Sequence, residues 1–180
     1  MSILTISGSL RGDSVNRKLL AEAATLYGGE VVEADLNLPL YDGDLEAAEG
    51  LPAKVKTLAD QVLSAEAILI STPEYNKAPS GVLKNALDWL SRDSRKVLSG
   101  KPVAVMSAAA GRTGGETAQY VLRNFLAPLR ANVVAGPAVC VAFAGKEFET
   151  GRLENERYLI ALEELTTLLK DTVASQSVPA

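Results

Sequence analysis

Short apolar runs alternate with longer amphipathic stretches along the whole chain, and this alternation constrains the fold more than any other feature. The run Ala-Ile-Leu-Ile-Ser at residues 67–71 is too apolar for a strand at the edge of a sheet. Between such runs, apolar residues recur at the spacing of helices that bury one face. Strands and helices of this kind indicate a parallel sheet covered on both faces. The sequence therefore predicts an α/β fold, a three-layer sandwich around a five-stranded parallel sheet.

The pattern also predicts the bounds of the elements and one domain. The predicted strands are residues 3–7, 30–34, 67–71, 102–107 and 132–135. Residues 138–142 can belong to the fifth strand as well. The predicted helices are residues 19–27, 52–62, 80–90, 117–129 and 153–173. Chain length and right-handed crossovers favour the strand order 2-1-3-4-5. Residues 36–51 are predicted to form an irregular, solvated connection. We expect one domain over residues 1–174 and a frayed tail at 175–180.

Charge and composition exclude several classes of function. The formal net charge of -4 argues against nucleic acid as the main partner, since phosphate backbones bind basic surfaces. No apolar run approaches the roughly 18 residues of a membrane span, so no membrane partner is expected. The chain of 180 residues has no histidine, which excludes histidine metal sites and Ser-His-Asp triads. Cys140 is the single cysteine and cannot form a disulfide within the chain, so we expect a cytoplasmic protein.

The loop after the first predicted strand, Gly-Ser-Leu-Arg-Gly-Asp-Ser-Val-Asn at residues 8–16, combines hydrogen-bond donors with the start of a helix. Ser9, Ser14 and Asn16 can donate from their side chains. Arg11 presents a fork of donors that matches a phosphate. The first N–H groups of a helix lack partners, and the helix dipole favours an anion there. The loop matches neither GxxxxGK[ST] nor GxGxxG. On this loop alone, a seat for a dianion without a metal and a capped turn with an exposed arginine are equally open.

Two more loops belong to the same edge of the predicted sheet, because ligands of such folds bind beyond the carboxyl ends of the strands. Residues 72–81 contain Pro-Glu-Tyr-Asn at 73–76, a stiff backbone beside an aromatic ring that can flank a flat heterocycle. Residues 107–115 carry small side chains and three glycines, which let a backbone approach a ligand closely. Together the three loops predict a mononucleotide site. A planar redox cofactor fits better than ATP, since no magnesium-binding pattern is present.

On these segments the sequence resembles the NADPH-dependent FMN reductase family of flavodoxin-like quinone, azo-dye and chromate reductases. The resemblance spans most of the chain and rests on GSLRGDSVNRKL at 8–19, PEYN at 73–76, GVLKNALDWLSR at 81–92, and the 107–115 loop followed by AQYVLR at 118–123. It implies a flavodoxin-like fold, bound FMN, and NADPH or NADH as electron donor. It also implies a homodimer or homotetramer, with an interface at the helix over residues 82–90.

Carried over by position, the resemblance implies a set of FMN-binding residues and no metal. Those around the phosphate are Ser9, Arg11, Ser14, Val15 and Asn16. Those along the isoalloxazine ring and ribityl chain are Pro73, Glu74, Tyr75 and Asn76, and those on the other side are Ser107 and the backbone near Gly111. Asp13, Ala78 and Ala109 depart from the family pattern. Asp13 is a carboxylate in a loop expected to hold an anion, so it is predicted to point outward or to pair with Arg17. The changes at Ala78 and Ala109 affect the rim expected to meet the acceptor.

The implied reaction is the transfer of hydride from NAD(P)H to the flavin, then of two electrons to a small acceptor such as a quinone, azo dye or chromate, in a ping-pong scheme. No side chain has to act as nucleophile or general base, so no catalytic residue is assigned. Two other interpretations stay open. One is a flavodoxin-like electron carrier, against which the mild charge and the arginine in the phosphate loop argue. The other is a binding protein that senses flavin or redox state.

Overall fold

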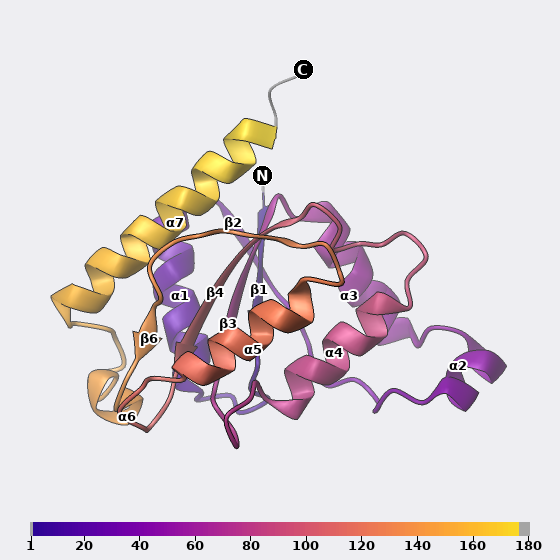
Figure 1. The fold of residues 1–180 in the computed structure, drawn as a ribbon, viewed down its shortest axis with the longest axis horizontal. Helices are drawn as coiled ribbons and strands as arrows, with labels where there is room; N and C mark the ends of the chain where they lie inside the picture. The colour runs from indigo at the N-terminus through magenta and orange to yellow at the C-terminus, as the bar shows by residue number, and fades with distance from the viewer. Residues whose placement is uncertain (1, 177–180) are drawn as a thin grey trace.

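The computed structural model describes residues 2–176, and these form a three-layer α/β sandwich (Figure 1). The strands of the central sheet are β1 (Ser2–Ser7), β2 (Glu30–Glu33), β3 (Ala67–Thr72), β4 (Pro102–Ala108) and β5 (Asn132–Val133), with the short β6 (Cys140–Val141) beside β4. The sheet has the order β2-β1-β3-β4-β5, and every pair is parallel. The predicted fold class and strand order are therefore confirmed.

The fifth place in the sheet is shared by two short strands, which corrects the one strand predicted at 132–135 with a possible extension over 138–142. β5 pairs with the start of β4, and β6 pairs with its end, where Ser107 faces Cys140. The chain leaves the sheet between them, at a segment that contains Gly136 and Pro137. Proline cannot donate to a ladder. A Cβ on Gly136 would lie 2.8 Å from Cδ1 of Leu168, so this segment packs closely against the last helix.

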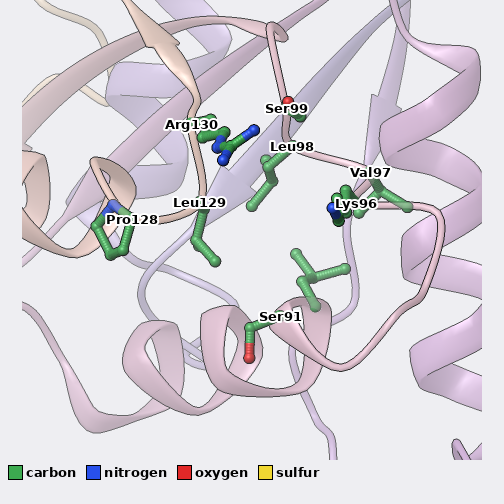
Figure 2. A pocket seen from close by; sticks show the side chains of 9 residues that line it. Ser91, Lys96, Val97, Leu98, Ser99, Pro128, Leu129 and Arg130 are labelled. Atoms are coloured by element: carbon green, nitrogen blue, oxygen red, sulfur yellow. The ribbon is translucent and has the colours of Figure 1, made fainter.

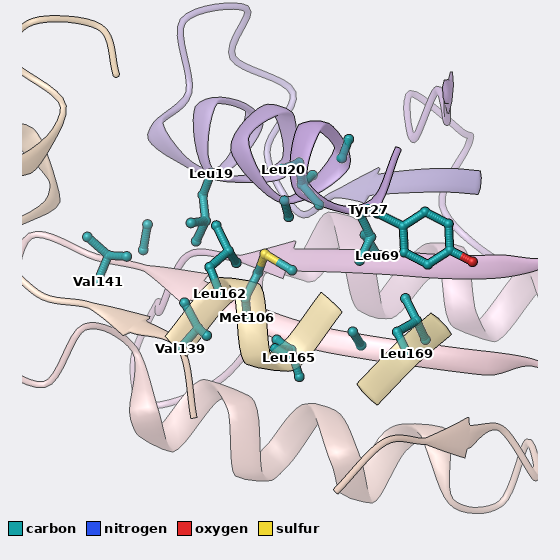
Figure 3. Close-up of a cluster of buried hydrophobic side chains, with 14 of the residues drawn as sticks. Leu19, Leu20, Tyr27, Leu69, Met106, Val139, Val141, Leu162, Leu165 and Leu169 are labelled. Carbon is teal, nitrogen blue, oxygen red and sulfur yellow. The ribbon is translucent and has the colours of Figure 1, made fainter. Parts of the chain in front are cut away.

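Helices cover both faces of the sheet, and alternate strand residues face alternate layers. On one face lie α1 (Val15–Tyr27) and α7 (Glu156–Gln176), which pack on Ile3 and Leu69 (Figure 3). On the other face lie α3 (Ala53–Ser64), α4 (Gly81–Ser91) and α5 (Glu116–Leu126), which pack on Leu4 and Ile68. Successive side chains of a strand point to opposite faces of the sheet, and in a central parallel strand the side chains on both faces are buried.

Two short helices were not predicted, and several helix ends differ from the predicted ones: α1 begins earlier, at Val15, and α5 ends earlier, at Leu126. Residues 36–51 contain α2 (Gly43–Glu49), whose first N–H groups are capped by the Asp42 carboxylate, 2.8 Å from the Asp44 nitrogen. α2 buries no residue, so it shows no apolar stripe in the sequence, although the segment is solvated as predicted. The other short helix is α6 (Ala144–Glu147). α7 runs to Gln176, so the start of the tail predicted to fray at 175–180 is helical, and 177–180 lie outside the described residues.

Within residues 2–176, none of the helices combines the length and the apolar character that crossing a bilayer demands.

Candidate functional site

A cavity of about 580 Å³ lies at the carboxyl ends of β1, β3 and β4. It falls within the range of small-molecule and cofactor sites, roughly 300–1,000 Å³. The predicted site residues that line it are Ser9, Arg11, Ser14, Val15, Asn16, Pro73, Glu74 and Tyr75. Asn76, Ser107 and Gly111 are not among the lining residues. The third loop contributes Ala108, Ala109 and Ala110, so the structure brings all three predicted loops together around one space.

The first loop offers donors at one end of this cavity. Ser14 caps α1, and its hydroxyl oxygen accepts a hydrogen bond from the Asn16 backbone nitrogen at 3.2 Å. The Arg11 guanidinium is exposed and makes no hydrogen bond or salt bridge with any described residue. The Val15 N–H, at the first position of α1, likewise has no partner within the described chain. A free guanidinium and a free helix N–H are suited to bind an anion.

Asn16 lines the cavity, and its side chain also holds parts of the site together. Its side chain is buried, with 1% exposure, and its Nδ2 donates to the Ala108 carbonyl at 3.0 Å. Its Oδ1 accepts from the Ala108 nitrogen at 3.1 Å and from the Ser71 hydroxyl at 2.7 Å. The amide therefore ties the start of α1 to the ends of β3 and β4.

Asp13 is exposed to solvent, but it also lines the cavity, and its partner is Lys18 and not the predicted Arg17. The Asp13 carboxylate lies 2.7 Å from the Lys18 ammonium, and its side chain is 83% exposed. The hydrogen bond from Lys18 lowers the pKa of Asp13 below its ordinary value, with a smaller contribution from Arg11. Arg17 instead pairs with Glu33, and its Nε donates to the Arg11 carbonyl at 3.1 Å. Lys18 partly neutralises the carboxylate at the edge of the anion seat.

The second loop ends in a tight hairpin that presents an aromatic ring. Tyr75 and Ala78 exchange two backbone hydrogen bonds, of 3.0 and 3.1 Å. The Tyr75 side chain is 56% exposed and lines the cavity. Asn76 and Lys77, between them, both have positive φ. Asn76 lies at the tip of this turn, which is why it does not reach the cavity.

The third loop is packed more tightly than its sequence suggested. Ser107 is fully buried in β4, and its hydroxyl donates to the Gly114 carbonyl at 2.7 Å. A Cβ on Gly114 would lie 2.4 Å from the Cys140 carbonyl group, and one on Gly115 would lie 2.9 Å from the Ser107 hydroxyl. These two glycines approach protein backbone and side chain rather than a ligand. Only Gly111 faces open space, with nothing within 4 Å of an added Cβ.

Sequence reasoning missed the wall of the cavity contributed by residues 144–149. The lining residues from this segment are Ala144, Gly145, Phe148 and Glu149. The Ala144 nitrogen donates to the Ala109 carbonyl at 3.0 Å, which joins α6 to the third loop. The position of this segment after the last strand was the available signal, because loops at the carboxyl ends of a parallel sheet share one edge.

A second cavity, of about 260 Å³, lies at the amino ends of the strands (Figure 2). Its rim carries Lys96 and Arg130, near the carboxyl ends of α4 and α5. Ligands of doubly wound folds bind at the other edge of the sheet, so the larger cavity is the better candidate. Within residues 2–176, no cluster of three or more Cys, Asp or Glu side chains could hold a metal ion.

Comparisons with known proteins agree on one group of enzymes. A family model described as NADPH-dependent FMN reductase matches residues 1–146. The chain is 42% identical over 161 residues to an NAD(P)H-dependent FMN reductase of Pseudomonas aeruginosa, covering 87% of this chain and 86% of the relative. It is 38% identical over 160 residues to a quinone reductase of Escherichia coli, covering 87% of this chain and 80% of that protein. Among solved structures, a flavoenzyme NAD(P)H:(acceptor) oxidoreductase from Paracoccus denitrificans matches with a TM-score of 0.83 and 30% identity, over 97% of each chain.

Proposed function

The chain belongs to the NADPH-dependent FMN reductase family, and from this premise we propose that it is an FMN-dependent NAD(P)H oxidoreductase that passes two electrons to quinone-type acceptors. The observation that carries the proposal is the cavity itself. At one end are a helix N-terminus and an unpaired arginine, and another part of its wall is formed by an exposed tyrosine on a rigid turn. FMN has an anionic phosphate and a flat ring joined by a ribityl chain, and these match the two parts of the cavity.

The first loop is proposed to hold the FMN phosphate. Arg11 would bind the phosphate oxygens through its guanidinium, and Val15 would donate its backbone N–H. Ser9 and Ser14 line the same part of the cavity and keep hydroxyl hydrogens that can point at an anion. Asn16 would act by holding the loop in place, through its bonds to Ala108.

The second and third loops are proposed to hold the isoalloxazine ring. Pro73, Glu74 and Tyr75 line one wall with stiff backbone and an aromatic ring, while residues 108–110 line another with alanines. Small side chains leave room for backbone N–H and C=O groups to approach ring atoms. Ser107 would support the third loop from inside, since its hydroxyl is bonded to Gly114.

The chain contributes binding and orientation rather than acid–base chemistry. FMN, when bound, supplies the capacity to take a hydride and to give up two electrons. The donor and the acceptor are proposed to use the cavity in turn, in a ping-pong scheme, with azo dyes and chromate as further acceptors. With no histidine in the chain, proton transfer from a histidine is excluded, and we assign no catalytic residue.

A homodimer or homotetramer and a cytoplasmic location are part of the same proposal. We propose that the interface lies at α4, whose surface carries Val82 and the ion pair between Lys84 and Asp88, 2.6 Å apart. Light scattering at several protein concentrations tests the oligomer.

The decisive experiment is NAD(P)H oxidation by FMN-loaded protein against a panel of acceptors. We expect FMN to bind without metal, NADPH or NADH alone to bleach the flavin in stopped flow, and quinones to restore its colour with multiple turnovers. A flavin that NAD(P)H does not bleach would favour an electron carrier, and bleaching with slow turnover on every acceptor would favour a redox-sensing protein. A protein that binds no FMN would refute all three.

A further inference from the structure

The hairpin that presents Tyr75 is built from residues that do not favour its shape. The central residues of the turn, Asn76 and Lys77, have φ angles of 51° and 66°, and the flanking Tyr75 and Ala78 are paired by two backbone hydrogen bonds. Positive φ at both central positions defines a type I′ turn, for which Asn-Gly is the favoured pair. Asparagine suits the first position, but lysine at the second carries a steric cost that surrounding structure must offset.

One carboxylate connects this turn to the body of the protein. Glu74 Oε1 lies 3.3 Å from the Lys77 ammonium, and Glu74 Oε2 accepts a hydrogen bond from the Ala118 nitrogen at 3.2 Å. The Glu74 side chain is only 12% exposed, whereas that of Lys77 is 72% exposed. A nearly buried anion thus holds an exposed cation at the strained position of the turn.

The helix end that Glu74 occupies has no cap of its own. α5 begins after Gly115, which has no side chain to accept from the first N–H groups. No larger residue fits there, since a Cβ would lie 2.9 Å from the Ser107 hydroxyl. The Glu74 carboxylate therefore serves as the cap of α5 from another loop, where the helix dipole also stabilises its charge.

We propose that Glu74 is a positioning residue: it clamps the Tyr75–Ala78 turn to the N-terminus of α5 and so holds Tyr75 in the orientation that the flavin ring requires. The proposal rests on the proposed FMN site. It changes the role that the family resemblance implied for Glu74, because the carboxylate is engaged with Lys77 and Ala118 rather than aimed at the ring. In this proposal Lys77 acts through its ion pair with Glu74.

The test uses the ability of glycine to take a positive φ without steric cost. Lys77→Gly turns the central pair into Asn-Gly, so the turn no longer needs the clamp. We expect Glu74→Ala to raise the Kd for FMN, measured by fluorescence titration, by about tenfold. In the Lys77→Gly background the same substitution is expected to change the Kd by less than about twofold. A tenfold loss that persists in that background would overturn the proposal, because it would mean that Glu74 acts on the flavin directly.

A second readout needs no cofactor. In the FMN-free protein, trypsin cleavage between Lys77 and Ala78 is expected to be about tenfold faster with Glu74→Ala than in the native chain, since the freed turn opens more often. Equal cleavage rates would overturn the clamp. If the native chain binds no FMN, the proposed function fails while this comparison still decides whether Glu74 holds the turn.

Two further variants serve as a control and as a substitute for Glu74→Ala. Asp35→Ala is the matched control, because Asp35 also accepts from a backbone nitrogen, that of Asn37 at 2.9 Å, and pairs with Lys54 at 2.9 Å, away from the cavity. It should leave both readouts unchanged, and equal effects from it would overturn the specific role. If Glu74→Ala does not fold, Glu74→Gln keeps an acceptor for Ala118 and loses only the ion pair. We then expect a smaller loss that Lys77→Gly abolishes, and a loss unaffected by Lys77→Gly would overturn the proposal.

Discussion

The side-chain amide of Asn16 pairs with the backbone of Ala108 through two hydrogen bonds, of 3.0 Å to the carbonyl and 3.1 Å from the nitrogen. The two residues are 92 positions apart, and their pairing joins the start of α1 to the end of β4. The Ser71 hydroxyl, at the end of β3, donates to the same amide oxygen. One side chain therefore sets the spacing of the three strand ends around the cavity.

Asn16→Ala should lower the free energy of unfolding by about 2–4 kcal/mol, because it leaves the buried polar groups of Ala108 and Ser71 without partners. It should also weaken FMN binding, since the two loops lose their fixed spacing. Urea unfolding and fluorescence titration measure the two effects. Asn124→Ala is the matched control on an exposed helix surface and should change stability by less than about 0.5 kcal/mol. An Asn16→Ala protein of native stability would contradict this account.

Arg11→Ala should weaken FMN binding by roughly tenfold to hundredfold, which corresponds to the loss of about 1.5–3 kcal/mol from a charge-assisted hydrogen bond. Its effect on unfolding should be small, because the guanidinium makes no hydrogen bond or salt bridge within the described chain. Arg112→Ala removes the same charge from an exposed position outside the cavity lining and should leave the Kd nearly unchanged. Equal losses in the two variants would indicate a general effect of charge and not a seat at Arg11.

Gly114→Ala should destabilise the protein by about 3 kcal/mol or more. Gly114 has a φ of 62°, and an added Cβ would meet the carbonyl group of Cys140, which is backbone and cannot turn aside. Gly111→Ala, in the same loop, meets nothing within 4 Å and should change stability by less than about 0.5 kcal/mol. Thermal unfolding of the two variants separates the two cases. Similar melting temperatures would show that the loop relaxes around the new side chain.

The architecture could be predicted from the sequence because it depends on local patterns. Strands such as residues 67–71 are apolar on both faces, and the helices between strands carry continuous apolar stripes, so periodicity alone indicates the layers. α2 and α6 have few or no buried residues and leave no such pattern. The fifth strand was misjudged because its break depends on Gly136 packing against Leu168, a contact that no local signal reports.

The residues that line the cavity could be predicted only in part, because the partners of polar side chains depend on tertiary structure. Ser9, Arg11 and Tyr75 were placed by residue type and strand order, and all three line the cavity. Asn16 was expected to donate to a ligand and Ser107 to border the site, yet the Asn16 side chain is bonded to the end of β4 and that of Ser107 to Gly114. A polar side chain in a loop can bind a ligand or hold the loop in place, and the residue that it contacts in the fold decides which of the two it does.

Asp13→Asn should strengthen FMN binding by up to about fivefold, because it removes a negative charge beside the expected phosphate and releases Lys18 from its ion pair. The pKa of Asp13 is lowered by Lys18, so the carboxylate stays ionised at neutral pH and opposes the anion throughout that range. The stabilising contribution of the pair is present above the ordinary value of about 3.9 and is lost as the pH falls through the lowered pKa. Titrations at low and high salt check the effect, which should shrink with salt. Weaker binding by Asp13→Asn would contradict it.

Cys140 should react slowly with thiol reagents in the folded protein. Burial raises the pKa of its thiol, and Gln119 Nε2 lies 3.2 Å from the sulfur. Since the thiolate is the reactive form, labelling at pH 7.5 should be at least about tenfold slower in the native protein than in urea. A raised pKa also favours the thiol form in the folded state. Its stabilising effect is therefore complete below about pH 8.5, the ordinary value, and is lost as the pH rises through the folded pKa. Urea unfolding at pH 7.5 and 9.5 should show a larger fall in stability for the native chain than for Cys140→Ala. Rapid labelling at pH 7.5 would contradict this prediction. An equal fall in the free energy of unfolding of the native chain and Cys140→Ala would also contradict it, because Cys140 would then behave as an exposed thiol.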